Sequence, residues 1–440
     1  MLAREIAFLD PAALASAWRG PGLGWLDGDG SPELGRFSFV ARRPAEIRRA
    51  AWGDPDPFAV VRGLGGRAGA APASGLEPAI VPRWIGVLSY DAAFSRGQAL
   101  GLRRPARLPR AALPVAHFAR YDALVAVDHV DRRAWVAGDE ASAVDRLAGE
   151  LAEGAPAGAA APRARLGPVQ GEPGAAHLDA IAAAMEAILA GDIYQANLAR
   201  SWHARLDGDP LALFLAMRRA SPVPLGAFLE AGGFSVLGRS MERFLRLDPR
   251  DRSIETRPIK GTIARAGDER AEARALGGDE KERAEHAMIV DLMRNDLGRL
   301  AEIGSVRVHD AMRVEPYAAL SHLVSTVRAR LRPEVGLDEV LDATFPPGSV
   351  TGAPKLRAME LIEELEREAR GFYCGAVGHV DHDGGLSLAV SIRTATVAGG
   401  EVRYPAGGGI VEASDPAREL AETELKARVF LEAAAALPRS

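Results

Sequence analysis

Two pairs of glutamates have a spacing that can place carboxylates side by side on a helix. Glu282 and Glu285 lie three residues apart in one stretch with helical spacing, and Glu419 and Glu422 lie three apart in another. Residues at i and i+3 project from the same helix face. One such pair most often marks a solvated face. The two pairs indicate chemistry only if their helices face one another.

A single lysine is the second candidate. Residues 254–262 read Ile-Glu-Thr-Arg-Pro-Ile-Lys-Gly-Thr. Pro258 fixes its own φ and biases Arg257 toward an extended conformation, so we expect a strand or a strand exit. Gly261 permits a turn that a residue with a Cβ would resist. Lys260 between them is held as a nucleophilic amine must be, although a lone lysine is usually a solvated surface residue.

The glutamates need two helices to position them. Residues 279–302 have a charged first turn followed by apolar residues at helical spacing, with Gly298 near the end. Near the carboxy terminus, Asp415 and Pro416 form a helix start, because aspartate is a good N-cap and proline fits the first helical position. Each helix therefore carries one Glu-x-x-Glu pair together with core residues.

Strands and loops between these helices carry further polar groups. Alternation in residues 192–198 places Gln195 and Asn197 on one side, either toward a cavity or in water on an edge strand. A predicted strand over residues 319–327 presents His322. The loop over residues 345–355 leads into a helix predicted over residues 356–370, and the helix start and the loop hydroxyls can receive an anion.

A glycine-rich segment completes the set of candidates. Strands are predicted over residues 371–380 and 386–395, and the second carries Arg393 near its end. Then come Gly407, Gly408 and Gly409, where a ligand can approach the backbone closely. Because glycine-rich turns are common, this triplet alone is weak evidence.

Composition narrows the class of protein. The 440 residues are 48% apolar and 26% charged, with a net charge of −5, which is ordinary for a globular protein and gives no footprint for nucleic acid or an anionic membrane. Cys374 is the one cysteine, so an intrachain disulfide or a thiolate metal cluster is excluded. Without a signal-peptide pattern or a long apolar run, we expect a cytoplasmic protein.

The chain divides into three parts by composition. Residues 1–152 have mixed α/β patterning, with strands predicted over residues 37–41, 84–90 and 123–128. Residues 153–174 are rich in Ala, Gly and Pro, which is typical of a linker. Residues 175–440 hold all of the candidate residues above.

Seven segments together resemble the chorismate-utilising enzymes, in order and spacing, across residues 175–435. These segments are residues 192–198, 241–245, 256–262, 282–296, 348–355, 391–393 and 407–422. The amino-terminal third matches only loosely. The resemblance implies an α+β fold in which two large, mostly antiparallel sheets pack together, with helices outside and an active-site cleft.

The resemblance also implies a bound Mg²⁺ and a set of residues around chorismate. Four carboxylates converging in a partly dry cleft would repel one another, and a dication removes that cost while accepting oxygen ligands. The implied metal ligands are Glu282, Glu285, Glu419 and Glu422. The implied substrate-binding residues are Gln195, Ser349, Tyr373, Arg393, Gly407, Gly408, Gly409 and Lys426.

Two positions select a branch of the family. Lys260 replaces the alanine of anthranilate synthases, and Gln195 replaces the lysine of isochorismate and salicylate synthases. This combination is similar to that of aminodeoxychorismate synthases, in which the lysine adds at C2 of chorismate, the C4 hydroxyl leaves, and ammonia then attacks C4. The resemblance implies that Glu242 assists hydroxyl departure and that His322 lies beside the ring. Met241 departs from the family's usual proline there.

We expect a separate glutamine amidotransferase subunit to supply ammonia, since Cys374 lacks the context of a glutaminase nucleophile. The expected reaction is an amino transfer to chorismate that serves para-aminobenzoate and folate biosynthesis. The alternatives are anthranilate synthase component I, which requires pyruvate loss, and a chorismate-binding homologue without turnover. The identity of the product separates them.

Overall fold

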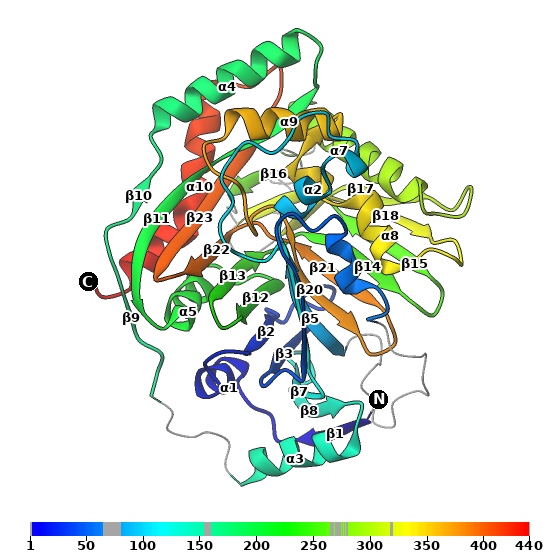
Figure 1. The fold of residues 1–440 in the computed structure, drawn as a ribbon, viewed down its shortest axis with the longest axis vertical. Helices are drawn as coiled ribbons and strands as arrows, with labels where there is room; N and C mark the ends of the chain where they lie inside the picture. The colour runs from blue at the N-terminus through cyan, green and yellow to red at the C-terminus, as the bar shows by residue number, and fades with distance from the viewer. Residues whose placement is uncertain are drawn as a thin grey trace.

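The fold is built on two antiparallel sheets that pack face to face, as the computed structural model shows (Figure 1). The structure describes residues 2–64, 81–153, 160–264, 268, 274, 276, 278, 280–316 and 320–439. This α+β architecture confirms the fold class predicted from the sequence.

The first sheet has 13 strands in the order β1-β8-β7-β3-β2-β12-β13-β22-β23-β11-β10, with β9 and β19 also paired to β11. The bounds are β1 Leu2–Ile6, β2 Gly24–Asp27, β3 Phe37–Ala41, β7 Ala123–Asp128, β8 Arg133–Gly138, β9 Ala164–Leu166, β10 Gln170–Gly171, β11 Gln195–Gly208, β12 Leu225–Glu230, β13 Phe234–Ser240, β19 Gly352–Ala353, β22 Thr394–Ala398 and β23 Glu401–Ile410.

The second sheet has ten strands in the order β16-β18-β15-β14-β21-β20-β5-β6-β4, with β17 also paired to β18. The bounds are β4 Glu46–Ala50, β5 Pro82–Leu88, β6 Ala116–Arg120, β14 Arg243–Asp248, β15 Ser253–Arg257, β16 Ile259–Ala264, β17 Arg307–Pro316, β18 Leu320–Arg330, β20 Ala376–Asp381 and β21 Leu386–Val390.

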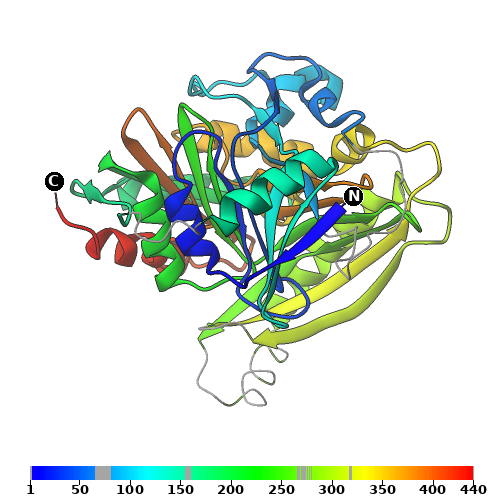
Figure 2. The same ribbon diagram turned by 90° about the horizontal axis from the view of Figure 1, so that it is seen from below.

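Helices cover the outer faces of both sheets. Their bounds are α1 Pro11–Ala17, α2 Asp91–Arg96, α3 Ala141–Ala152, α4 Gly174–Leu189, α5 Pro210–Ala220, α7 Glu280–Gly298, α8 Leu337–Thr344, α9 Lys355–Leu365 and α10 Pro416–Ala435, with 3₁₀ turns η1 Pro57–Val61, η3 Gly97–Leu100 and η4 Gly348–Val350. Figure 2 shows β1, α1 and α3 together at the end of the molecule that holds the amino terminus. In the described part of the chain, no helix is long and apolar enough to cross a membrane.

Three layers of apolar packing follow from strand alternation. On β5, Ile85 and Val87 point into the core between the sheets, whereas Trp84 and Leu88 point to the outer face beneath α7 and α8. The outer face of the first sheet packs on α1, α3, α5 and α10, where the ring of Tyr404 stacks on Phe430 at 4.9 Å. A smaller cluster joins α4 and α9 to β11 and β23.

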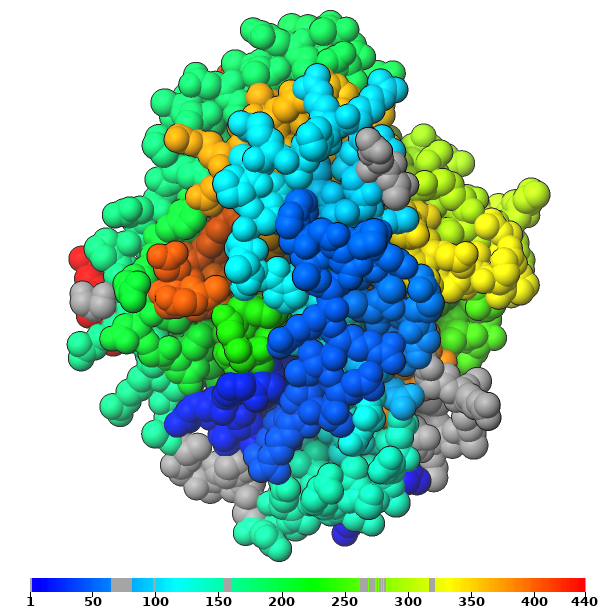
Figure 3. All heavy atoms as spheres, in the orientation of Figure 1, coloured from blue at the N-terminus to red at the C-terminus, as the bar shows by residue number. Residues whose placement is uncertain are grey.

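Both sheets take strands from both ends of the sequence. Val87 of β5 pairs with Val377 of β20, and Leu26 of β2 pairs with Ala227 of β12. In Figure 3, blue and cyan atoms of the first third lie directly against orange atoms of the carboxy-terminal strands. Within the predicted linker, β9 and β10 pair with β11. The division at residues 153–174 remains a prediction about the sequence, while in space the flanking parts share both sheets.

Some predicted elements end earlier than expected. The helix start at Asp415 is confirmed, since its side chain accepts a hydrogen bond from Arg418 N. The helix predicted over residues 356–370 ends at Leu365, because Glu366 turns inward with ψ 155°. The helix predicted over residues 279–302 ends at Gly298, and residue 279 lies outside the described residues. The segment 371–375 forms turns, and β20 begins only at Ala376.

Candidate functional site

Lys260 stands at a kink near the beginning of β16. Pro258 separates β15 from β16, Gly261 has φ +65°, and the pairing of β16 with β18 shifts register just after Lys260. A positive φ of this size is strained for residues with a Cβ. The predicted strand and turn around Lys260 are therefore confirmed, and they fix the direction of its side chain.

The amine of Lys260 contacts a carboxylate of the first predicted glutamate pair. Its Nζ donates to Glu285 Oε2 at 3.0 Å, and both side chains are largely buried. Burial alone would lower the pKa of Lys260, but Glu285, helped by Glu422 and Glu282, outweighs burial and raises this pKa above its usual value. The structure thus holds the amine as a cation among carboxylates.

Gln195 reaches the same point from the first sheet. A Cβ at Gly409 would lie only 2.2 Å from Gln195 Nε2 and 2.7 Å from Lys260 Nζ, so both side chains converge on a position that only glycine allows. Gln195 is 1% exposed, and its Oε1 and Asn197 Oδ1 are buried without a hydrogen-bond partner in the described residues. The amide pair therefore faces the interior, which settles the alternative that the sequence left open.

The second glutamate pair lies beside the next glycine. A Cβ at Gly408 would lie 3.3 Å from Glu419 Oε2 and 3.6 Å from Glu422 Oε1, while one at Gly261 would lie 3.3 Å from Glu282 Oε2. Gly261 follows Lys260 in the chain, and Gly408 precedes Gly409, against which the Lys260 amine lies. The predicted metal-binding pairs of α7 and α10 are therefore both close to that amine. Carboxylates of both helices therefore approach the same amine.

The donor set suits Mg²⁺, which prefers carboxylate oxygens and retained waters. Three of the four carboxylates, those of Glu285, Glu422 and Glu282, act on the Lys260 amine. Among the described residues, however, no three of the four offer one ligand atom each within 4.8 Å of one another. The Lys260 ammonium offsets part of their charge here. The Mg²⁺ site therefore stays a prediction, supported by the type and convergence of the ligands.

Glu242 is the buried acid of the site. It lies between β13 and β14 and is 5% exposed, and its carboxyl group accepts hydrogen bonds from the Ser349 hydroxyl and the backbone of Ile259. Burial raises the pKa of Glu242 to about 7, although Ser349 and Lys260 pull it down. A carboxyl group with this pKa can release or accept a proton near neutral pH.

His322 and Arg393 approach from the second sheet and from the turn after it. His322 Nδ1 lies 2.9 Å from Gly261 O, and burial lowers the pKa of His322 to about 4, so the ring is neutral. Arg393 lies between β21 and β22 with φ +49°, close enough to His322 to lower that pKa further. No carboxylate pairs with Arg393 among the residues described, which suits a group that binds an anion.

The remaining predicted residues occupy two different surroundings. Lys426 Nζ donates to Gly407 O at 2.8 Å and pairs with Glu422 at 2.6 Å, so it adjoins the glycine strand. Tyr373 is 4% exposed within the apolar core, and its ring lies 6.0 Å from the guanidinium of Arg370. Its predicted role in substrate binding is not supported by a contact with the Lys260 cluster in the described residues.

Sequence reasoning missed two buried ion pairs next to the site. Lys355 Nζ donates to Asp296, Thr344 O and Pro346 O, and so ties α7 to the loop that carries Ser349. Arg370 pairs with Glu366 at 2.7 Å. The i to i+4 spacing of Glu366 and Arg370 was the available signal, but it reads as an ordinary solvated helix pair. One of the loop hydroxyls predicted to receive an anion, that of Thr351, instead donates to Pro347 O and Gly348 O.

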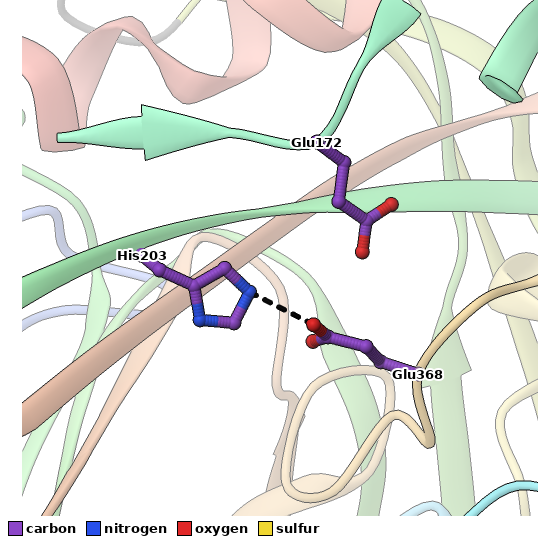
Figure 4. Close-up of side chains that lie close together, drawn as sticks. All are labelled: Glu172, His203 and Glu368. Atoms are coloured by element: carbon purple, nitrogen blue, oxygen red, sulfur yellow. Dashed lines mark ion pairs between the residues drawn. The ribbon is translucent and has the colours of Figure 1, made fainter.

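Another cluster of possible metal ligands lies away from Lys260. Glu172, His203 and Glu368 have ligand atoms within 4.8 Å of one another, and His203 Nε2 lies 3.0 Å from Glu368 Oε1 (Figure 4). Arg403 also pairs with Glu368 at 2.8 Å, which supplies the positive charge that an ion would bring. We therefore interpret His203, Glu368 and Arg403 as an ion-pair network within the chain and not as a metal site.

A pocket of about 260 Å³ borders that network and none of the predicted site residues line it. Its walls include Trp52, Arg110, Phe372 and Pro405, from both the amino-terminal third and the carboxy-terminal strands. Because Lys260, Glu242 and the glutamates converge elsewhere, we place the chemistry at the Lys260 cluster and not in this pocket.

Comparisons with known proteins agree with this geometry. A model of the family described as chorismate binding enzyme matches residues 41–432. Aminodeoxychorismate synthase of Streptomyces griseus is 41% identical over 361 residues, which are 79% of this chain and 49% of that protein. Anthranilate synthase component 1 of Streptomyces coelicolor is 39% identical over 431 residues, covering 91% of this chain and 81% of that protein.

A solved structure gives the same result for the fold. The crystal structure of anthranilate synthase component I from Streptococcus pneumoniae superposes with a TM-score of 0.78 at 30% identity, covering 90% of this chain and 92% of that one. The matched segment spans about half the length of the Streptomyces griseus relative.

Proposed function

Because this chain belongs to the family of chorismate binding enzymes, we propose that it converts chorismate and ammonia to 4-amino-4-deoxychorismate, as an aminodeoxychorismate synthase component 1. The observation that carries the proposal is the meeting of the Lys260 amine with the Gln195 amide at Gly409. A primary amine at this point supplies the nucleophile, and an amide beside it does not activate water as a basic amine would.

The first half of the reaction joins the lysine to the substrate. The Lys260 ammonium gives a proton to solvent and its nitrogen bonds to C2 of chorismate. The two conjugated ring double bonds then shift from C1=C2 and C5=C6 to C1=C6 and C4=C5, and the C4–O bond breaks. Glu242 gives its proton to the departing hydroxyl, which leaves as water. The pKa of about 7 allows Glu242 to hold that proton at neutral pH.

The second half releases the lysine. Ammonia attacks C4, the two double bonds shift back, and the bond between C2 and the Lys260 nitrogen breaks. The new C4 ammonium returns a proton to Glu242, and the released Lys260 amine takes one from solvent. The sum is chorismate plus ammonia giving 4-amino-4-deoxychorismate plus water. Gln195 and His322 border the ring, and Arg393 pairs with a substrate carboxylate.

We also propose that Glu282, Glu285, Glu419 and Glu422 hold Mg²⁺. When bound, the ion supplies positive charge that offsets the carboxylates and engages a substrate carboxylate. Ammonia is proposed to come from a glutamine amidotransferase subunit, consistent with the word "component" in the names of the related synthases. The product would serve para-aminobenzoate and folate biosynthesis.

A second candidate is anthranilate synthase component 1, favoured by the Streptomyces coelicolor relative, which matches more of this chain. Mass spectrometry of the product from chorismate, ammonium and Mg²⁺ separates the two, since anthranilate has lost pyruvate and aminodeoxychorismate keeps the enolpyruvyl group. Anthranilate as the main product would overturn the proposal, and absence of any turnover at saturating ammonium would favour a binding homologue.

A further inference from the structure

Arg370 is a fully buried arginine beside the site that the mechanism above does not use. It follows α9 and is 3% exposed. Its Nε donates a hydrogen bond to Glu366 Oε2 at 3.1 Å, and one terminal nitrogen donates to Glu366 Oε1 at 2.7 Å. The other terminal nitrogen donates to Val350 O at 2.7 Å, and the first also donates to Asn197 O. Every side of the guanidinium is engaged.

The acceptors belong to the two segments that carry site residues. Val350 follows Ser349 in η4, and Ser349 donates to the Glu242 carboxyl group. Asn197 lies on β11, two residues after Gln195. Glu366 adds a third link, since its Oε1 also accepts from Ala199 N at 2.9 Å. One ion pair therefore joins η4 to the strand that carries Gln195.

Stability alone does not explain such a pair. Removing two charges from water costs about as much as their attraction returns, so apolar residues of similar volume would serve equally well. A planar guanidinium instead fixes several acceptors in one geometry, which lysine cannot do. The arrangement is suited to holding two backbones at a fixed separation.

We propose that Arg370, held by Glu366, is a positioning residue that keeps the Ser349 hydroxyl on the Glu242 carboxyl group. This inference rests on the proposed role of Glu242 as the acid. Losing the Ser349 hydrogen bond would raise the pKa of Glu242, because that bond lowers it. Among the described residues, the other charged or titratable groups that act on Glu242 are Lys260 on β16, Lys426 on α10 and Cys374 before β20.

The test is a double-mutant cycle on chorismate consumption with Arg370→Lys, Ser349→Ala and both together. Loss of one hydrogen bond to the acid should lower kcat by about tenfold with KM little changed. Each single variant should move the limb of the kcat/KM profile that reports Glu242 to higher pH. The double variant should be no slower than Ser349→Ala.

Arg239→Lys is the matched control. Arg239 is 1% exposed, pairs with Asp27 and donates to Ser221 O. None of its side-chain hydrogen bonds within the described residues reaches η4 or β11. It should lower Tm without moving the pH limb. If Arg370→Lys does not fold, Glu366→Gln carries the same test, since it weakens the pair but keeps an oxygen for Ala199 N.

The inference would be overturned if the two losses of kcat multiply in the double variant. It would also be overturned if Arg370→Lys does not shift the pH of the Glu242 limb in the kcat/KM profile. A limb that Ser349→Ala leaves in place would overturn both this inference and the role of Glu242. Because chorismate consumption is followed whichever product forms, an unexpected product would contradict the proposed function while leaving the positioning role standing.

Discussion

A buried lysine contacts α7 near each of its ends, Lys260 from β16 and Lys355 from α9. The pKa values of the two lysines shift in opposite directions. Lys260 lies 3.0 Å from Glu285 near the start of the helix, and Lys355 lies 2.5 Å from Asp296 near its end. Their side chains are 15% and 13% exposed, so burial does not distinguish them.

The surroundings of the two amines make the difference. Lys355 shares its protons among Asp296 and two backbone carbonyls, and burial lowers its pKa against the pull of Asp296. Burial also raises the pKa of Asp296, so in both partners desolvation outweighs the attraction. Around Lys260, three carboxylates reverse that outcome. The proposed nucleophile is therefore distinguished by an excess of carboxylates and by the neighbouring glycines, whereas Lys355 donates to Asp296 and two backbone carbonyls.

Lys260→Ala should give the largest effect. Removal of the nucleophile should lower aminodeoxychorismate formation by on the order of a thousandfold or more, because the covalent route is lost. Product formation is measured by mass spectrometry, and circular dichroism checks the fold. Wild-type protein deprived of ammonia should also show a chorismate-derived adduct on Lys260.

An unchanged rate in Lys260→Ala, with no adduct trapped in the wild type, would make Lys260 a structural residue like Lys355. The comparison between the two lysines would then fail at its central point.

Glu285→Gln and Glu422→Gln should come next. Each removes a ligand charge with little change of volume, so turnover at limiting Mg²⁺ should fall by about 10–100-fold or more. Calorimetric titration with Mg²⁺ should show weaker binding. Glu280→Gln, at an exposed position in the first turn of the same helix, is the control. Wild-type turnover in either variant would contradict the carboxylate site.

Lys355→Met should act on stability. It leaves Asp296 buried without its cation, which costs about 3–5 kcal/mol for a broken buried pair. Urea unfolding measures this loss, and Lys355→Met combined with Asp296→Asn should recover part of it. Turnover of the folded fraction should fall far less than in Lys260→Ala. If Lys355→Met lost as much turnover as Lys260→Ala at unchanged stability, Lys355 would have a role in the chemistry and the comparison would be wrong.

The smallest expected effect is a change of protonation near the Lys260 end. With a pKa of about 7, Glu242 should be mostly protonated at pH 6 and mostly ionised at pH 8. Difference infrared spectroscopy against Glu242→Gln should show a carboxylic acid band that disappears across this range. One limb of the kcat/KM profile near pH 7 should disappear in the same variant. A carboxylate already ionised at pH 6 would refute the acid role.

The sequence predicted the parts of the site better than the contacts between them. The fold class, the family, the turn at Gly261 and the helix start at Asp415 were predicted correctly, because each has a local pattern or a specific motif. The hydrogen bonds from Arg370 to the carbonyls of Val350 and Asn197 were not predicted, because spacing within one helix does not reveal acceptors that lie far away in the chain. The early end of α9 at Leu365 was missed for the same reason.

The pairing of β5 with β20 has a consequence for synthesis of the protein. Val87 leaves the ribosome long before its partner Val377, so the amino-terminal strands must wait with unpaired edges. At about 5–20 residues per second, that wait lasts on the order of tens of seconds. Sheets closed by such distant strands also form slowly. Until the last strands are made, the nascent chain therefore exposes an edge of β5 that can pair with other chains.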